Sequence, residues 1–170
     1  MGTLAISFIG KSITALAADK NKRIISFHEI KSNFDFDDTD YENRYDNRTI
    51  TETAELIQDE LKDNLTGISY AGALINTSQA FLNVIPIDAS EDGDNLSSHL
   101  MWDLSMYFPE SYKNYSANYF KIDNPNLPPE VTEILMIAIT KEKLEFIRKI
   151  FALLGLKIKI FDVDHFAAEK

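Results

Sequence analysis

Three residues near the amino terminus, Gly10, Lys11 and Ser12, carry chemical groups that can bind an anion. A glycine lets the backbone come close to a phosphate, the neighbouring amides can donate hydrogen bonds, and the lysine supplies a cation. The same residues also separate two apolar, strand-like segments, so a hairpin turn explains them without any ligand. Because short motifs match by chance, the hairpin turn is the favoured interpretation.

Carboxylates form a second candidate group, over residues 35–46. This segment lacks the glycine at the sixth position and the closing glutamate of an EF-hand loop, so it indicates an exposed loop rather than a calcium site. Asp162 and Asp164 would share one face of a strand, but no other residue of catalytic character lies near them in sequence. A capping role for Asp164, in a helix that begins at His165, is the simpler interpretation. The histidines are scattered without an i, i+4 partner, which argues against a metal site.

Aromatic residues are the third candidate. They are concentrated in one short part of the chain and comprise Trp102, Tyr107, Phe108, Tyr112, Tyr115, Tyr119 and Phe120. Packing of a helix on a sheet accounts for most of them, but the aromatic area exceeds what a thin subdomain buries, and Tyr and Trp are favoured at interfaces. We therefore predict partner binding at Tyr112, Tyr115 and Tyr119, with Trp102 and Phe108 buried against the sheet.

Composition limits the function further. The chain has 170 residues, is 45% hydrophobic and contains no cysteine, so it can build a core and has no disulfide or thiolate chemistry. Its net charge of −10 argues against nucleic-acid binding, which needs clustered Lys and Arg. Its apolar runs are well short of the roughly twenty residues that cross a bilayer. These features predict a soluble cytoplasmic protein.

The elements that would position these residues follow from periodicity and turn signals. Over residues 4–75, these signals predict strands 4–9, 12–19 and 23–30, an exposed connection 31–48, a helix capped at Thr49 and Glu52, and strand 68–75. The second part predicts strand 79–88, loop 89–95, helix 97–108, strand 114–123, loop 124–129, strand 131–140, helix 141–156 with Gly155 ending it, and strand 157–163. The order is β-β-β-α-β followed by β-α-β-β-α-β. A new helix is only begun at His165, so we expect the chain to be cut short.

Four segments in this order carry a resemblance to a known family. They are LAISFIGKSITAL, GALINTSQAFLNVIPID, the aromatic helix before FPESY, and EILMIAITKEKLEFIRKIFALLGLKIKIFDVDHFAAEK. Together they resemble the PilM-type cytoplasmic proteins of type IV pilus and type II secretion machines, which are relatives of FtsA in the actin-like ATPase superfamily. The resemblance covers the whole chain.

The resemblance implies an α/β fold. Residues 1–77 and 163–170 would form an incomplete actin-like (ribonuclease H-like) subdomain, and residues 78–162 a small β-α-β-β-α-β insert of the FtsA and PilM type. The second half of an actin-like fold, with its second phosphate loop, would lie beyond Lys170. Ser7 stands where the family's first phosphate loop has an Asp that holds the metal-bound water, and Ile9 where it has a glycine. We therefore expect no enzyme activity and no cofactor.

The resemblance also implies a function. The chain would be a cytoplasmic assembly adaptor at the inner face of the inner membrane, holding a short apolar tail of a PilN-like inner-membrane protein in the cleft between subdomain and insert. It would be attached to the membrane only through that partner. The sequence leaves open whether the protein forms a homo-oligomer. The alternative is an actin-like ATPase in which Gly10, Lys11 and Ser12 contact phosphate, with ATP and Mg as cofactors. The sequence leaves open which machine the protein serves.

Overall fold

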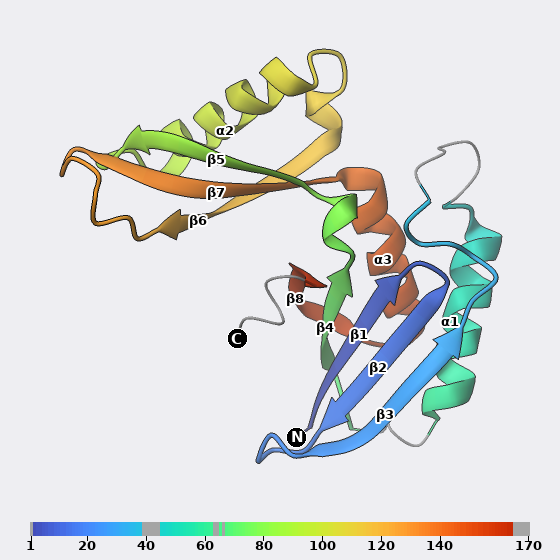
Figure 1. The fold of residues 1–170 in the computed structure, drawn as a ribbon. Coiled ribbons are helices and arrows are strands. Elements are labelled where there is room, and N and C mark those ends of the chain that lie inside the picture. Colours follow the sequence, from blue (N-terminus) through green and yellow to red (C-terminus); the bar gives the residue numbers. More distant parts are fainter. Residues whose placement is uncertain (1, 39–44, 63–64, 66, 165–170) are drawn as a thin grey trace. The chain divides into compact units, whose positions relative to one another are not determined.

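The computed structural model describes residues 2–38, 45–62, 65 and 67–164, which form a mixed α/β fold with two β-sheets (Figure 1). The chain divides into two compact units: unit 1 comprises Met1–Gln79 and Lys143–Lys170, and unit 2 comprises Ala80–Glu142. The predicted α/β class is confirmed. Within the described part of the chain, no helix is long and apolar enough to cross a membrane.

Unit 1 is built on a five-stranded sheet with the order β3-β2-β1-β4-β8. Its strands are β1 (Thr3–Ile9), β2 (Ser12–Ala18), β3 (Ile24–Lys31), β4 (Tyr70–Ile75) and β8 (Lys157–Val163). The first three pair as antiparallel hairpins, as predicted, whereas β4 is parallel to both β1 and β8. The parallel pairs bring the carboxyl ends of β1, β4 and β8 to one edge of the sheet.

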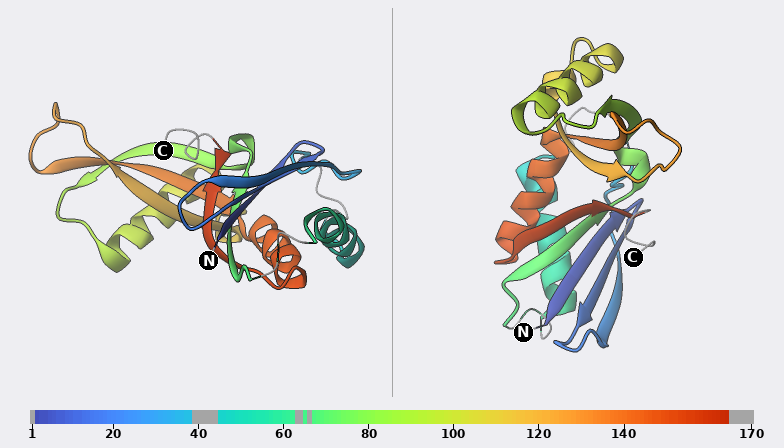
Figure 2. Two further views of the ribbon diagram at one scale, coloured as in Figure 1. Left: turned by 90° about the horizontal axis from the view of Figure 1, so that it is seen from below. Right: turned by 90° about the vertical axis from the view of Figure 1, so that its left-hand side faces the viewer.

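Two helices, α1 (Asn47–Leu61) and α3 (Lys141–Leu153), cover the same face of this sheet (Figure 2). Strand alternation directs Leu4, Ile6 and Phe8 toward them, and all three side chains are buried. The sequence predicted a cap by Thr49 and Glu52 for α1. The structure instead has Asp46 as the N-cap, with its Oδ1 accepting the Thr49 amide at 2.7 Å, so the helix begins two residues earlier than Thr49.

The connection after β3 is not the exposed segment that the sequence predicted. Phe36 is 2% exposed, and its ring lies 5.1 Å from Phe8 and 5.1 Å from Phe34. Phe34 in turn lies 5.5 Å from Phe146 of α3. These ring contacts hold Phe36 in the core of unit 1 and leave residues 34, 35 and 37 half-buried. Asp40 and Glu42 of the predicted acidic loop lie outside the described residues.

Unit 2 contains a three-stranded antiparallel sheet with the order β5-β7-β6. The strands are β5 (Phe81–Asp88), β6 (Tyr115–Ile122) and β7 (Val131–Thr140), and helix α2 (Gly93–Tyr107) packs on one face of the sheet (Figure 1). The 3-10 turn η2 (Tyr112–Asn114) lies before β6, whereas the 3-10 turn η1 (Thr77–Gln79) belongs to unit 1 and follows β4. Buried residues of the helix, including Leu96, Leu100 and Leu104, meet Ile134 and Met136 of the central strand.

The boundaries of the units differ from those predicted. The insert was expected over 78–162, but it ends after Glu142, and α3 and β8 belong to unit 1. The physical reason is strand pairing, because β8 extends the five-stranded sheet through its parallel ladder with β4. The predicted helix from His165 lies outside the described residues.

Candidate functional site

The Gly10, Lys11 and Ser12 segment forms the turn of the β1–β2 hairpin, in which Ile9 pairs with Ser12. Gly10 has φ +54°, a left-handed conformation that favours glycine. The segment is fixed by the chain after β3: the Gly10 carbonyl accepts the Phe36 amide at 2.7 Å, and the Lys11 carbonyl accepts the Ser32 amide at 2.9 Å. Lys11 is exposed, and Ser12 Oγ donates to Glu29 Oε1 at 3.4 Å.

The amide of Gly10, which the phosphate-loop alternative would aim at a phosphate, already has an anionic partner. It donates to Asp37 Oδ2 at 2.8 Å, and Asn76 Nδ2 donates to the same oxygen at 2.6 Å. The other oxygen, Asp37 Oδ1, is buried without a hydrogen-bond partner. A carboxylate in this position repels phosphate and uses the amide that would bind it.

Lys143 is the second unexpected group at this edge of the sheet. It lies in the first turn of α3 with 2% of its surface exposed. Its Nζ donates to the Phe36 carbonyl at 2.6 Å and to Gln79 Oε1 at 2.9 Å, while Gln79 Nε2 donates to the Asp37 carbonyl at 2.7 Å. A buried ammonium is tolerated when acceptors of this kind surround it.

A third contact ties the ends of β4 and β8 together. Asp164 Oδ1 accepts the Thr77 amide at 2.8 Å and the Thr77 hydroxyl at 2.5 Å. Asp162 Oδ1 accepts the Val163 amide, so the hydrogen bonds of the two aspartates described here go to different local partners. We call the whole set of hydrogen-bonded groups at this edge the polar edge cluster; it comprises Gly10, Asp37, Asn76, Thr77, Gln79, Lys143 and Asp164.

The position of the polar edge cluster is where open α/β sheets bind ligands, outside the carboxyl ends of parallel strands. Its side chains nevertheless hydrogen-bond with one another and with the backbone, with Asp37 Oδ1 left as a buried atom that has no partner in the described part of the chain. Among the residues that the structure describes, no group of three or more His, Cys, Asp or Glu is arranged to hold a metal ion. The arrangement is suited to locking the β1–β2 turn, the segment 34–37 and the start of α3 together.

Sequence reasoning missed Asp37 and Lys143 as members of this cluster. Lys143 had a signal: it lies four residues before Ile147 and seven before Ile150, on the apolar stripe of α3, where a charged residue needs a buried partner. Asp37 had none, because it was one carboxylate among several in an aperiodic segment.

The predicted partner-binding tyrosines lie in unit 2, and all three are half-buried. Tyr112, Tyr115 and Tyr119 pack against the core between α2 and the sheet. Tyr115 stacks on Phe108 with ring centroids 4.7 Å apart and an interplanar angle of 21°. Tyr115 and Tyr119 therefore belong largely to the core, whereas Tyr112 also reaches a surface hollow.

Trp102 was predicted to be buried against the sheet, but it is 60% exposed. The reason is helical phase: Leu96, Leu100 and Leu104 form the inward stripe of α2, which turns Trp102 outward. It borders a shallow hollow of about 600 Å³, lined also by Asp94, Ser97, Ser98, Met101, Ser105 and Tyr112. We call this the Trp102 groove.

Comparisons with known proteins place the fold. No family model and no curated protein sequence matches the chain. Among solved structures, a chain of a PilM–PilN type IV pilus biogenesis complex superposes with a TM-score of 0.76 at 12% identity, covering 97% of this chain and 48% of that one. The cytoplasmic domain of EpsL, an inner-membrane component of the type II secretion system of Vibrio cholerae, gives a TM-score of 0.68 at 12% identity, covering 98% and 59%.

The chain therefore spans about half the length of the structures that it matches. At this level of identity the likeness concerns the fold. The predicted actin-like architecture is confirmed, since both structures share it across nearly the whole of this chain.

Proposed function

We propose that the protein is a cytoplasmic adaptor in a pilus or secretion assembly machine, where it binds the cytoplasmic tail of a PilN-like inner-membrane protein. The observation that supports this most is the superposition on a chain of the PilM–PilN complex over 97% of the protein. The second structure, EpsL, is itself a component of a secretion machine at the inner membrane. Folds host many functions, so the argument also needs a binding surface in this chain.

The Trp102 groove of unit 2 supplies such a surface. It combines an exposed Trp102, the half-buried Met101 and Tyr112, and serine hydroxyls along one side of α2. Trp and Tyr contribute disproportionately to interface energies because they bury a large area at low entropic cost. An exposed tryptophan beside a hollow fits a short apolar segment with a few backbone hydrogen bonds. We place the tail there, with Tyr112 as one of its contacts.

Trp102 is the single tryptophan of the chain, so it reports directly on this groove. We would titrate the protein with the cytoplasmic tail peptide of the PilN-like protein encoded in the same genome and follow the emission of Trp102. Burial of the indole by an apolar tail shifts its emission to shorter wavelength, and the shift should saturate. If no such tail changes the emission or binds by calorimetry, the adaptor proposal fails.

A pair of matched variants locates the binding. Ser98→Arg places a long side chain in the groove, whereas Ser116→Arg makes the same change at an exposed position of β6, where alternation directs the side chain away from α2. Losing a central contact of an interface weakens binding about tenfold. We expect that loss for Ser98→Arg and an unchanged Kd for Ser116→Arg. Equal affinity of the two variants for the tail peptide would show that the tail does not bind beside α2.

We also infer that the protein is not an ATPase and takes no nucleotide through Gly10, Lys11 and Ser12. The support is the Asp37 carboxylate, which occupies the Gly10 amide. An incoming phosphate would have to displace a negative charge that accepts two hydrogen bonds.

A further inference from the structure

Two shallow hollows lie along the outer side of α2, and Trp102 borders both of them. The hollow of the Trp102 groove is lined mainly by residues that recur every three or four positions along the helix. A second hollow, of about 500 Å³, shares Ser98 and Trp102 with it. The other residues that line this second hollow are Glu91, Asn95 and His99. The exposed part of Trp102 is therefore accessible from two hollows.

The three serines of the Trp102 groove donate their hydroxyl protons to the helix itself. Ser98 Oγ donates to the Asp94 carbonyl at 2.8 Å, and Ser105 Oγ donates to the Trp102 carbonyl at 2.6 Å. Ser97 Oγ donates to the carbonyl four residues before it at 3.0 Å. A hydroxyl has one proton and two lone pairs, so toward the groove these oxygens can only accept. An occupant must therefore supply hydrogen-bond donors.

Negative charge surrounds the same stripe of α2. Residues 80–112 contain no lysine or arginine, and unit 2 as a whole has ten acidic residues against three lysines. Asp94 is exposed, and its carboxylate has no hydrogen bond or ion pair within the part of the chain that the structure describes. Glu91 has the His99 ring as its partner, with Nδ1 3.1 Å from each carboxylate oxygen. Charge complementarity therefore favours a cationic occupant.

Trp102 supplies an aromatic surface for that cation. A cation over an aromatic ring is attracted by the negative face of the ring, and tryptophan is the strongest partner of this kind. The chain places its own Lys113 over the Tyr112 ring, with Nζ 5.7 Å from the centroid. Among the described residues no lysine or arginine covers Trp102 in the same way, so its ring is the open aromatic position of the groove.

Asp94 by itself would indicate no ligand, because an acid in the first turn of a helix stabilises the start of that helix. The helix dipole does not explain the exposed Trp102 or the acceptor oxygens beside it. Asp94 and Trp102 are about 12 Å apart along the helix axis, with Ser98 midway between them. A long cationic side chain laid on Trp102 would therefore reach Ser98 and face Asp94.

Arginine suits this arrangement better than lysine. Its guanidinium is planar and stacks on aromatic rings, and it carries five N–H donors in a fixed geometry. It can lie flat on Trp102 while its edge donates to Ser98 Oγ. The lysine ammonium is a compact, strongly hydrated charge without a flat face.

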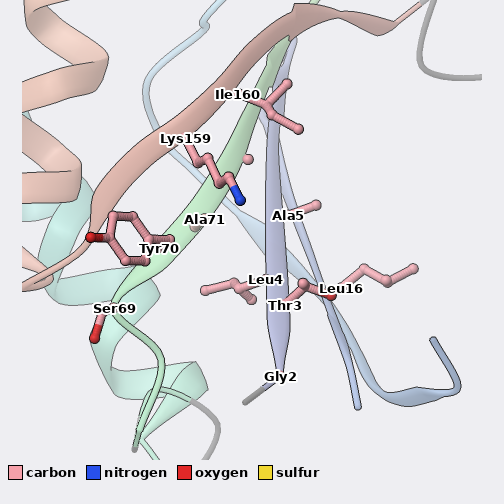
Figure 3. A pocket seen from close by; sticks show the side chains of 11 residues that line it. Gly2, Thr3, Leu4, Ala5, Leu16, Ser69, Tyr70, Ala71, Lys159 and Ile160 are labelled. Carbon is pink, nitrogen blue, oxygen red and sulfur yellow. The ribbon is translucent and has the colours of Figure 1, made fainter. Parts of the chain in front are cut away.

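A hollow in the sheet of unit 1 has the opposite charge. Its volume is about 410 Å³, and its lining is mainly apolar. Figure 3 shows Lys159, its one charged residue, among the side chains that line it. A cationic segment would be repelled there, so the preference inferred for the Trp102 groove is not shared by the hollow of unit 1.

We propose that the segment held in the Trp102 groove carries an arginine, whose guanidinium stacks on Trp102, donates to Ser98 Oγ and faces the Asp94 carboxylate. This rests on the adaptor function proposed above, and it adds the chemistry of the partner, which is an apolar tail that contains an arginine.

Three fluorescent peptides test the charge of the occupant with the whole chain. They share one sequence of leucines and serines and differ in a central residue, which is arginine, citrulline or glutamate. Citrulline has nearly the shape of arginine and keeps N–H donors, but it is neutral. We expect the arginine peptide to bind about tenfold more tightly than the citrulline peptide, because the cation–π and ionic contacts act together. The glutamate peptide should bind most weakly, and added salt should reduce these differences.

Fluorescence anisotropy measures the Kd of each peptide, and the emission of Trp102 reports whether the indole is covered. Three results would overturn the proposal: equal affinity of the arginine and citrulline peptides, tightest binding of the glutamate peptide, or no binding of the arginine peptide.

A pair of charge-reversed variants locates the effect. Asp94→Lys reverses the charge in the groove, whereas Asp123→Lys makes the same change at an exposed position of unit 2 that lines neither hollow. Asp94→Lys should weaken the arginine peptide about tenfold, since attraction becomes repulsion, and should strengthen the glutamate peptide. Asp123→Lys should leave both Kd values unchanged. Equal effects of the two variants, each first shown to be folded by urea denaturation, would refute the proposal.

Trp102→Leu tests the stacking, because leucine keeps an apolar side chain without the aromatic face. The variant should bind the arginine peptide about tenfold more weakly and should affect the citrulline peptide less. A loss of the same size for both peptides would contradict stacking of the guanidinium on Trp102.

The natural tail peptide separates this inference from the adaptor proposal. If the tail binds beside Trp102 and keeps its Kd when its arginines are replaced with citrulline, the inference fails and the adaptor proposal stands. If the tail does not bind but the arginine peptide does, the adaptor proposal fails and the preference of the groove for arginine stands. A concentration-dependent dimer that Asp94→Lys dissociates would assign the groove to a second copy of the chain and overturn both.

Discussion

The Gly10 amide nitrogen lies 2.8 Å from Asp37 Oδ2, across 27 residues of sequence. This hydrogen bond fastens the first hairpin turn to the segment that follows β3, and it places a negative charge at the one turn of the chain that resembles a phosphate loop. Because Asn76 Nδ2 donates to the same oxygen, the carboxylate also links the end of β1 to the end of β4. In the ATPase alternative, a phosphate of the nucleotide would bind the Gly10 amide. In the structure the Asp37 carboxylate already accepts that amide.

Mg-ATP should leave the melting temperature of this protein unchanged. A ligand that binds only the folded state stabilises it, by about 2.7 kcal/mol when present at a hundred times its Kd. Differential scanning fluorimetry with increasing Mg-ATP, and with Mg²⁺ alone as the control, measures the effect. A reproducible upward shift that saturates with ATP would show that phosphate does displace the Asp37 carboxylate.

Replacing Asp37 with alanine should lower the free energy of unfolding by about 1–3 kcal/mol, because the Gly10 amide and Asn76 Nδ2 lose their shared acceptor. Urea denaturation followed by circular dichroism gives the value. The control is Asp123→Ala, at an exposed position of unit 2, which should change stability by less than about 0.5 kcal/mol. Similar values for the two variants would mean that the turn is held by its backbone contacts alone.

The elements with strong local signals could be predicted from the sequence. An unbroken apolar run predicted strand 131–140, and the structure has a strand at Val131–Thr140. Apolar residues spaced three or four apart predicted helix 141–156, and the structure has a helix at Lys141–Leu153. Gly155 has φ +71° just beyond that helix, as expected of a residue that ends one.

Features that depend on distant residues could not be predicted. The burial of Phe36 depends on Phe8 and on Phe146 of α3, and nothing in an aperiodic segment indicates such partners. The same holds for the end of the insert, because the parallel pairing of β8 with β4 has no local signal. At the candidate site, the turn at Gly10 could be predicted from the sequence, but the Asp37 carboxylate that accepts the Gly10 amide could not.

Within unit 2, protease should cut residues 124–129 before residues 89–95. The sequence predicted both to be exposed loops, yet Gly93–Asn95 form the first turn of α2, and Asp88 Oδ1 accepts the Ser90 amide at 2.8 Å in the turn before it. A protease must unfold a helical turn before it can cleave there, which slows the reaction. Brief digestion with subtilisin and mass spectrometry of the fragments identifies the sites. Earlier cleavage at 89–95 would mean that α2 begins later than Gly93.

The cap of α1 should make stability depend on pH. The hydrogen bonds from the Thr49 amide and hydroxyl, helped by the Arg48 charge, hold the pKa of Asp46 below its ordinary value of 3.8. Because the folded state favours the charged carboxylate, this contribution is complete above pH 3.8 and is lost as pH falls through the lower folded pKa. Asp46→Ala should therefore be less stable than the natural protein at neutral pH, and the difference should shrink in acid.

Urea denaturation at a series of pH values, from neutral through 3.8 and below, measures that difference. Asp46→Asn is the matched control, since asparagine keeps a capping oxygen without the charge. It should lose less stability than Asp46→Ala at neutral pH and should lack the acid-dependent loss contributed by this residue. A difference between the alanine variant and the natural protein that stays constant with pH would contradict the role of the charge.

Truncation of two aromatic residues in unit 2 should separate the core from the surface. The ring of Phe108 stacks on Tyr115 at 4.7 Å and meets Phe81 at 5.1 Å, so Phe108→Ala should cost about 3 kcal/mol of stability through the cavity and the lost ring contacts. Trp102 is 60% exposed on the outer side of α2, so Trp102→Ala should change stability by only about 0.5 kcal/mol. Urea denaturation followed by far-ultraviolet circular dichroism measures both variants without relying on the indole. The sequence predicted that both residues are buried against the sheet. A loss of stability for Trp102→Ala as large as that for Phe108→Ala would support that prediction. The Trp102 groove would then lack the exposed aromatic residue on which it depends.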